Sequence, residues 1–147
     1  MMIRFKPLPS DIEKRLPLAA EYLRSHLQVV FAYLFGGLAR GERGPLSDVD
    51  IAVFLADAGN AGKTKPELLE NLTELLGTDE VDLVVLNAVE NVPLVGGILK
   101  SSKVIVDKVP FERHNFESVA LRKYFDFEPR ELRILEGKVM RPWSTKT

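Results

Sequence analysis

The chain contains no cysteine among its 147 residues. This absence excludes disulfide bonds, thiolate metal sites and a cysteine nucleophile, and it suits a reducing compartment. No apolar run approaches the roughly 18 residues that a membrane-spanning helix requires. Residues 1–9 include early positive charges without a long apolar segment behind them, so no signal peptide is expected. Together these absences predict a cytoplasmic protein that does not bind membranes.

A surplus of charge of either sign is also missing. The 20 basic and 21 acidic residues leave a net charge of −1, which gives no basis for broad nucleic-acid binding. The hydrophobic fraction of 46% and the length of 147 residues fit one globular domain, 1–147, with its own core. Within it, residues 111–147 are expected to form a C-terminal helical extension. Its aromatic residues are expected to pack these helices, with a partner-binding surface as the alternative.

Hydrophobic periodicity predicts alternating helices and strands. A first helix is expected from Ser10, in a capping box with Glu13, to about His26, with a kink or division at Pro17. Strands are expected at 29–35, 48–55, 81–86 and 103–106, and further helices at 38–43, 66–76, 93–101 and from about 111, the last interrupted at Pro129. Residues 57–65 are expected to form an exposed loop.

The connection between the first two strands, residues 36–47, is short for a parallel crossover and favours an antiparallel or mixed pair. The expected fold is therefore α/β (α+β) with a small mixed sheet and helices packed on it, not a doubly wound Rossmann domain.

Two aspartates at the start of the second expected strand are the first candidate site residues. Asp48 and Asp50 are two residues apart, so their side chains leave the same face of the strand while Val49 points to the other. Two such carboxylates can converge on one ion or an ion pair, and all-oxygen ligands favour Mg²⁺ or Mn²⁺. Asp82, between two apolar residues of the next strand, is the best third ligand. Two metal ions held by these acids would clamp an in-line phosphoryl displacement.

Gly36 and Gly37 end the first expected strand abruptly. Glycines at such a turn let the backbone approach a phosphate, and the N–H groups of a following helix favour anions. Arg40 and Ser47 are further nucleotide-binding candidates, although Arg40 also suits an exposed helix and Ser47 a turn cap. Lys63 and Lys65 are interpreted as solvated loop residues, with nucleotide contact as the alternative.

Gly36-Gly37, ten residues and then Asp48-Val49-Asp50 resemble the signature of the DNA polymerase β-like nucleotidyltransferase superfamily. That signature is Gly-Ser, ten residues, then Asp-x-Asp. The adjoining Ala39-Arg40-Gly41 and Ser47-Asp48 are similar to its minimal nucleotidyltransferase (MNT) branch. The later Phe125-Asp126-Phe127-Glu128-Pro129 resembles the tails of MNT antitoxins.

The resemblance implies a polymerase β-like core with a four-stranded mixed sheet, and transfer of a nucleoside monophosphate from ATP with release of pyrophosphate. It also implies a HEPN-domain RNase toxin as partner, silenced by AMP on a hydroxyl, typically of tyrosine. In this interpretation Asp48 and Asp50 bind metal, and Asp82 helps to deprotonate or position the attacking hydroxyl. A homodimer or a hetero-oligomer with the toxin is compatible with it.

Gly37 departs from the signature, because the family has serine there. The backbone N–H is retained, but the loss of a hydrogen bond to a charged group costs about 1.5–3 kcal/mol and predicts reduced activity. Two alternatives therefore stay open. One is a weakened MNT module that neutralises its partner by binding alone, and the other is a nucleotidyltransferase for a small molecule.

Overall fold

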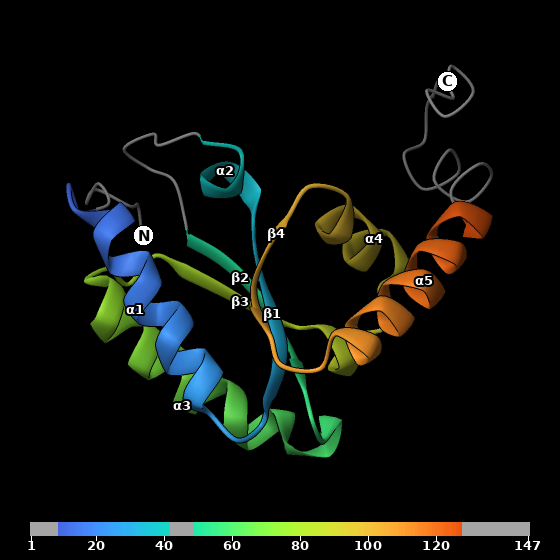
Figure 1. The fold of residues 1–147 in the computed structure, drawn as a ribbon, viewed down its shortest axis with the longest axis horizontal. Coiled ribbons are helices and arrows are strands. Elements are labelled where there is room, and N and C mark those ends of the chain that lie inside the picture. Colours follow the sequence, from blue (N-terminus) through green and yellow to red (C-terminus); the bar gives the residue numbers. More distant parts are fainter. Residues whose placement is uncertain (1–8, 42–48, 128–147) are drawn as a thin grey trace, which may run out of the picture.

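The computed structural model describes residues 9–41 and 49–127, whose centre is a four-stranded sheet (Figure 1). Its order is β3-β2-β1-β4. The central strand β1 is antiparallel to β2 and to β4, whereas β2 and β3 are parallel. The strands are β1 (Val29–Phe35), β2 (Val49–Leu55), β3 (Val81–Val85) and β4 (Lys103–Asp107). The mixed four-stranded sheet and the antiparallel first pair expected from the short connection are confirmed.

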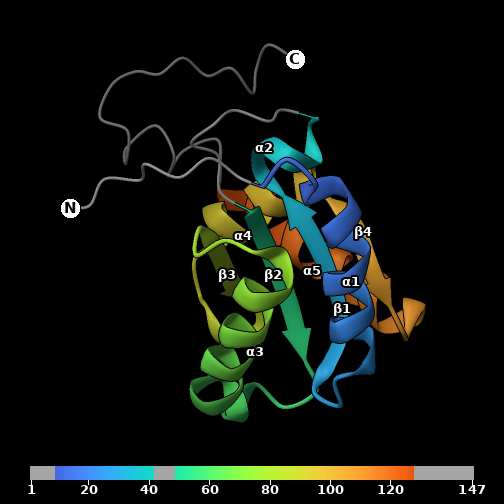
Figure 2. The same cartoon turned by 90° about the vertical axis from the view of Figure 1, so that its left-hand side faces the viewer.

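Helices cover both faces of this sheet (Figures 1 and 2). On one face α1 packs against α3, and on the other α4 packs against α5. A one-turn helix, α2, follows β1, and the short 3-10 helices η1 and η2 follow β2 and β3. The helices are α1 (Ile12–Ser25), α2 (Gly36–Ala39), η1 (Ala58–Asn60), α3 (Ala61–Leu76), η2 (Leu86–Ala88), α4 (Val92–Lys100) and α5 (Pro110–Phe127).

The sheet separates two apolar cores, because alternate side chains of each strand point to opposite faces. The larger core lies under α1 and α3 and includes Ile12, Leu23, Ile51, Val53, Leu68 and Leu72. The smaller core lies under α4 and α5 and includes Phe31, Tyr33, Ala52, Leu86, Val95 and Ile98. Phe31 stacks on Phe54 with ring centroids 4.5 Å apart, and Phe116 of α5 packs against both rings.

The first helix corrects two expectations. Its N-cap is Asp11, without a capping hydrogen bond from the side chain, so the capping box of Ser10 and Glu13 is wrong. Pro17 does not divide the helix, which continues as one element to Ser25. Pro17 is exposed, so hydration can replace the backbone hydrogen bond that a proline cannot donate.

The expected loop at 57–65 is also wrong. The chain forms η1, where the Asp57 side chain accepts a 2.9 Å hydrogen bond from the Gly59 N–H, and then enters α3 at Ala61. Pro66 consequently lies inside α3 rather than in its first turn. Packing explains the early start, since Thr64 is buried together with Leu68 on the same helix face. Gly77 ends α3 as expected, with a left-handed φ of +71°.

The contact between α4 and α5 depends on Gly96. A Cβ atom at this position would lie 2.7 Å from Cβ of Tyr124, and closer still to its Cγ and Cδ1. The neighbouring Gly97 has no such neighbour, because an added Cβ would meet nothing within 4 Å. Lys100 completes the contact with its Nζ 5.0 Å from the centroid of the Tyr124 ring.

These two glycines provide a matched test of the contact. Gly96→Ala is expected to destabilise the fold by about 1–3 kcal/mol, because Tyr124 must move to admit the methyl group. Gly97→Ala is expected to stabilise the exposed helix position by up to about 1 kcal/mol. Urea denaturation monitored by circular dichroism measures both changes. Equal effects of the two substitutions would contradict the proposed role of Gly96.

Candidate active site

The sheet brings two of the three predicted acids together. Asp50 of β2 and Asp82 of β3 are directly paired in the parallel register. Neighbouring strands lie about 4.8 Å apart, so both carboxylates can reach one bound cation. Asp50 is partly buried and Asp82 is exposed, while Val49 and Ile51 are completely buried on the opposite face. The expected burial of Val49, Ile51 and Val53 on one face of β2 is observed. The opposite face is polar only at Asp50, because Ala52 and Phe54 on that face belong to the smaller apolar core.

Gly36 lies against the carboxylate of Asp50. It follows Phe35, which is the antiparallel partner of Asp50, and it has a φ of +78°. A Cβ atom at Gly36 would lie 2.9 Å from Cγ of Asp50 and closer still to Oδ2. Glycine is thus required at this position for two reasons. The backbone is left-handed, and the Asp50 side chain occupies the space that a Cβ atom would need. The sequence predicted Gly36 as a phosphate-binding residue, whereas the structure adds its contact with Asp50.

The helix α2 begins beside this acid pair, at Gly36 rather than at the expected Leu38. Gly37 is therefore the second residue of the helix and not part of a preceding turn. The first N–H groups of a helix have no acceptor within it, and they favour anions. Arg40 caps α2 with a 3.0 Å backbone hydrogen bond from its N–H to the Gly37 carbonyl oxygen, and the residue is exposed.

Two other predicted site residues, Ser47 and Asp48, lie outside the described residues. Within residues 9–41 and 49–127, no three histidine, aspartate or glutamate side chains gather as a metal site. Asp50 and Asp82 are two members of the predicted set of three carboxylates, and Asp48 is the third. The expected helix interruption at Pro129 also falls outside the described ranges.

Lys63 and Lys65 lie far from the acid pair. Both are exposed in the first turns of α3, which follows the C-terminal end of β2, whereas Asp50 is near its N-terminal end. At about 3.3 Å per residue, the five residues from Asp50 to Leu55 span roughly 16 Å. The interpretation of both lysines as solvated fits this position better than nucleotide contact does.

A partly buried polar network on the same face of the sheet as Asp50 was not predicted. The Tyr33 hydroxyl donates a 2.6 Å hydrogen bond to Glu117 of α5, and burial raises the pKa of this phenol. Arg113 bridges Glu117 and Asp107 at 3.0 Å and 2.9 Å, respectively. Its hydrogen bond to Asp107 raises the pKa of the guanidinium, which stays charged. The network ties α5 to β1 and β4. A tyrosine inside an otherwise apolar strand was the only signal for it.

Residues 19–110 match the model of the family described as polymerase beta, nucleotidyltransferase. This match spans β1, α2, β2 and β3, and thus every element around Asp50 and Asp82. The chain belongs to this nucleotidyltransferase family. No curated protein matches the chain in sequence.

Solved structures share the nucleotidyltransferase fold. A toxin–antitoxin structure with AMP-PNP is 22% identical, with a TM-score of 0.67 over 84% of this chain and 95% of the other. The toxin–antitoxin MntA–HepT is 22% identical, with a TM-score of 0.61 over 87% and 97%. A tri-AMPylated HEPN toxin of Shewanella oneidensis in complex with an MNT antitoxin is 21% identical, with a TM-score of 0.61 over 85% and 93%. The fold of this nucleotidyltransferase is therefore similar to that of MNT antitoxins.

In the described part of the nucleotidyltransferase chain, no helix combines the length and apolar character needed to cross a bilayer.

Proposed function

We propose that the chain is a metal-dependent antitoxin that transfers AMP from ATP to a hydroxyl group, typically of tyrosine, on a HEPN-domain toxin. The main support is the pairing of Asp50 with Asp82 beside Gly36, in a chain of the nucleotidyltransferase family. The similar structures point to the same reaction, since one contains AMP-PNP and another a tri-AMPylated HEPN toxin. A reaction that uses ATP and acts on an RNase would be expected in the cytoplasm.

The acid pair fits a hard divalent cation. Its donors are carboxylate oxygens on adjacent strands, and these are ligands that Mg²⁺ or Mn²⁺ prefers. Asp48, Asp50 and Asp82 would hold two Mg²⁺ ions. These ions would neutralise the negative charge of the ATP phosphates. The first N–H groups of α2, at Gly37 and Leu38, would hold a phosphate group of ATP.

The remaining groups position the reactants. Asp82 is the exposed acid of the pair, and in this proposal it would orient the acceptor hydroxyl and take up its proton. As the hydroxyl oxygen bonds to the α-phosphorus of ATP, the bond to the β-phosphate breaks and pyrophosphate leaves. Arg40, exposed at the end of α2, and Ser47 would add contacts to the nucleotide.

A second candidate function rests on Gly37, which replaces the serine of the family signature. In this alternative the chain neutralises its partner by stable association, and transfer is too slow to matter. Asp48→Asn would then leave neutralisation intact. Truncation or charge changes in residues 111–147 would abolish it.

The deciding experiment uses the proposed partner, a HEPN-domain toxin. Incubation with ATP and Mg²⁺ is expected to increase the intact mass of that protein by one or more AMP units. EDTA is expected to prevent the increase. An unchanged mass together with full neutralisation of toxicity would overturn AMP transfer and support association alone. No interaction of any kind would overturn both functions.

Gly37→Ser tests the missing hydroxyl directly. Gly37 is partly exposed at the start of α2, and serine is well accepted at helix starts. A restored hydrogen bond to a phosphate is worth about 1.5–3 kcal/mol, so we expect transfer to become about ten- to a hundredfold faster. Gly37→Ala is the matched control, because it adds the Cβ atom without the hydroxyl. Equal rates in the two variants would contradict the phosphate contact.

A further inference from the structure

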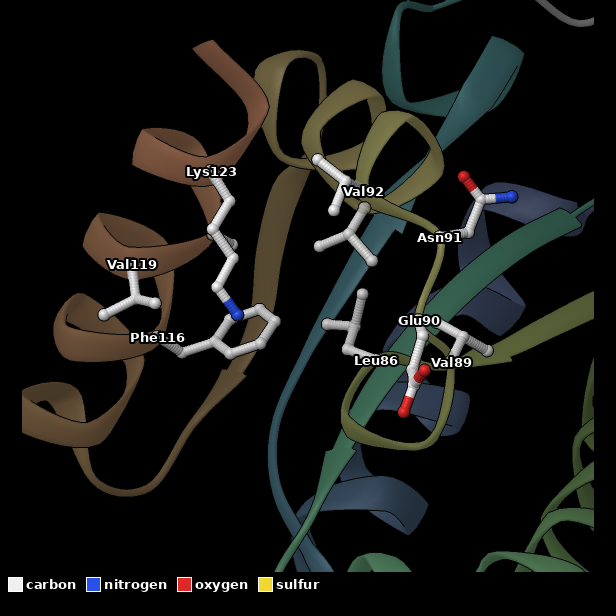
Figure 3. A pocket seen from close by; sticks show the side chains of 10 residues that line it. Leu86, Val89, Glu90, Asn91, Val92, Phe116, Val119 and Lys123 are labelled. Carbon is white, nitrogen blue, oxygen red and sulfur yellow. The ribbon is translucent and has the colours of Figure 1, made fainter. Parts of the chain in front are cut away.

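A cavity of about 430 Å³ lies between α5 and the segment that joins η2 to α4 (Figure 3). Its volume falls within the range of about 300–1,000 Å³ that is typical of small-molecule sites. Seven of its ten lining residues are apolar, and Leu86 and Val95 are buried beneath it. Phe116 and Ala120 of α5 form part of the opposite wall.

The cavity is separate from the candidate active site. Leu86 lies four residues beyond Asp82, which corresponds to roughly 13 Å along an extended chain. The cavity is bounded by η2, the N-terminal half of α4 and the middle of α5, and none of these elements contains a predicted site residue. A molecule bound there would not occupy the position of Asp50, Gly36 or Gly37.

Two side chains of opposite charge line the same cavity from different walls. Glu90 comes from the η2–α4 segment and Lys123 from α5, and Figure 3 shows them on either side of the apolar surface. Both residues are exposed, and neither side chain forms an ion pair or a hydrogen bond with another residue of the described ranges. Arg113 of the same helix is, by contrast, paired with Asp107 and Glu117.

We propose that this cavity binds a small molecule with an apolar or aromatic body that bears both an ammonium and a carboxylate group, as a large apolar amino acid does. The body packs on Leu86, Val95 and Phe116. The ammonium group pairs with Glu90 and the carboxylate with Lys123. Such a ligand bridges α5 and the η2–α4 segment, and its binding is independent of the proposed transfer reaction.

Isothermal titration calorimetry with three related probes tests the proposal. L-phenylalanine has both charges, 3-phenylpropionate lacks the ammonium group, and phenethylamine lacks the carboxylate. We expect L-phenylalanine to bind with a Kd of about 1 mM or lower. Each one-charge probe is expected to bind about two- to fivefold more weakly, as for solvent-exposed ion pairs. Absence of L-phenylalanine binding, or equal binding of all three probes, would overturn the proposal.

Substitutions of Glu90 and Lys123 test which charged group of the ligand each residue binds. Glu90→Gln is expected to remove the advantage of L-phenylalanine over 3-phenylpropionate, and Lys123→Gln its advantage over phenethylamine. Arg122→Gln is the matched control, since this neighbouring exposed residue of α5 does not line the cavity. Ala120→Phe is expected to fill the cavity and abolish binding of every probe. If Ala120→Phe fails to fold, the Glu90→Gln and Lys123→Gln variants provide the test. Unchanged relative affinities for the three probes in both of these variants would overturn the proposed orientation.

Discussion

Replacing Asp50 by asparagine is expected to reduce AMP transfer by at least about a hundredfold. The substitution keeps the size of the side chain but removes a carboxylate from the acid pair with Asp82. A divalent cation at such a site contributes several kcal/mol to transition-state stabilisation, and each 1.4 kcal/mol or so is a factor of ten in rate. The measurement is single-turnover transfer of labelled AMP to the partner toxin at saturating Mg²⁺.

The matched control for this variant is Asp79→Asn. Asp79 is an exposed acid in the turn before β3, and it is not part of the proposed site. The same loss of one negative charge there is expected to leave the transfer rate close to wild type. If Asp50→Asn transferred AMP as fast as Asp79→Asn, the metal-binding role of Asp50 would be wrong.

Gly36→Ala is expected to reduce transfer about a hundredfold while also destabilising the protein. The new methyl group would occupy the space of the Asp50 carboxylate, 2.9 Å from its Cγ and closer still to its Oδ2. A misplacement of about 1 Å in a catalytic group can cost a factor of about a hundred in rate. The left-handed φ of +78° adds about 1–2 kcal/mol of backbone strain in any residue with a Cβ atom. Transfer assays and urea denaturation separate the two effects.

Gly41→Ala measures the effect of backbone strain alone on stability and on transfer. Gly41 has a similar φ of +84°, but an added Cβ atom would meet nothing within 4 Å. This variant is therefore expected to lose about the same stability from strain as Gly36→Ala, but to retain most of its transfer activity. Equal losses of activity in both variants would show that strain, and not displacement of Asp50, explains the effect.

Local patterns in the sequence were sufficient for most elements of the fold. The β-branched and aromatic run at 29–35 and the alternation after Asp48 predicted β1 and β2, because both patterns are local signals of strands. The short connection between them correctly favoured an antiparallel pair. The short helix η1 and the start of α3 at Ala61 were missed because glycine, alanine and asparagine there are weak local signals. Burial of Thr64 against the core, a long-range effect, outweighs them.

The candidate site likewise has features that local sequence predicts and features that depend on long-range contacts. A spacing of two residues predicts that Asp48 and Asp50 share a face, and the flanking glycines predict a turn, since both are properties of the local backbone. The direct pairing of Asp50 with Asp82 depends on strand register, which joins residues far apart in the chain. The contact of Gly36 with the Asp50 carboxylate and the network of Tyr33 with Glu117 also join separate elements.

The amino-acid sequence thus specified most of the elements and the mixed sheet, and it predicted the chemical type of the site, because periodicity, turns and residue spacing are local. The tertiary structure alone decided which acid lies beside Asp50, why Gly36 must be glycine and where the cavity between Glu90 and Lys123 forms. These features depend on strand register and helix packing, which result from burial of the whole core rather than from any single segment.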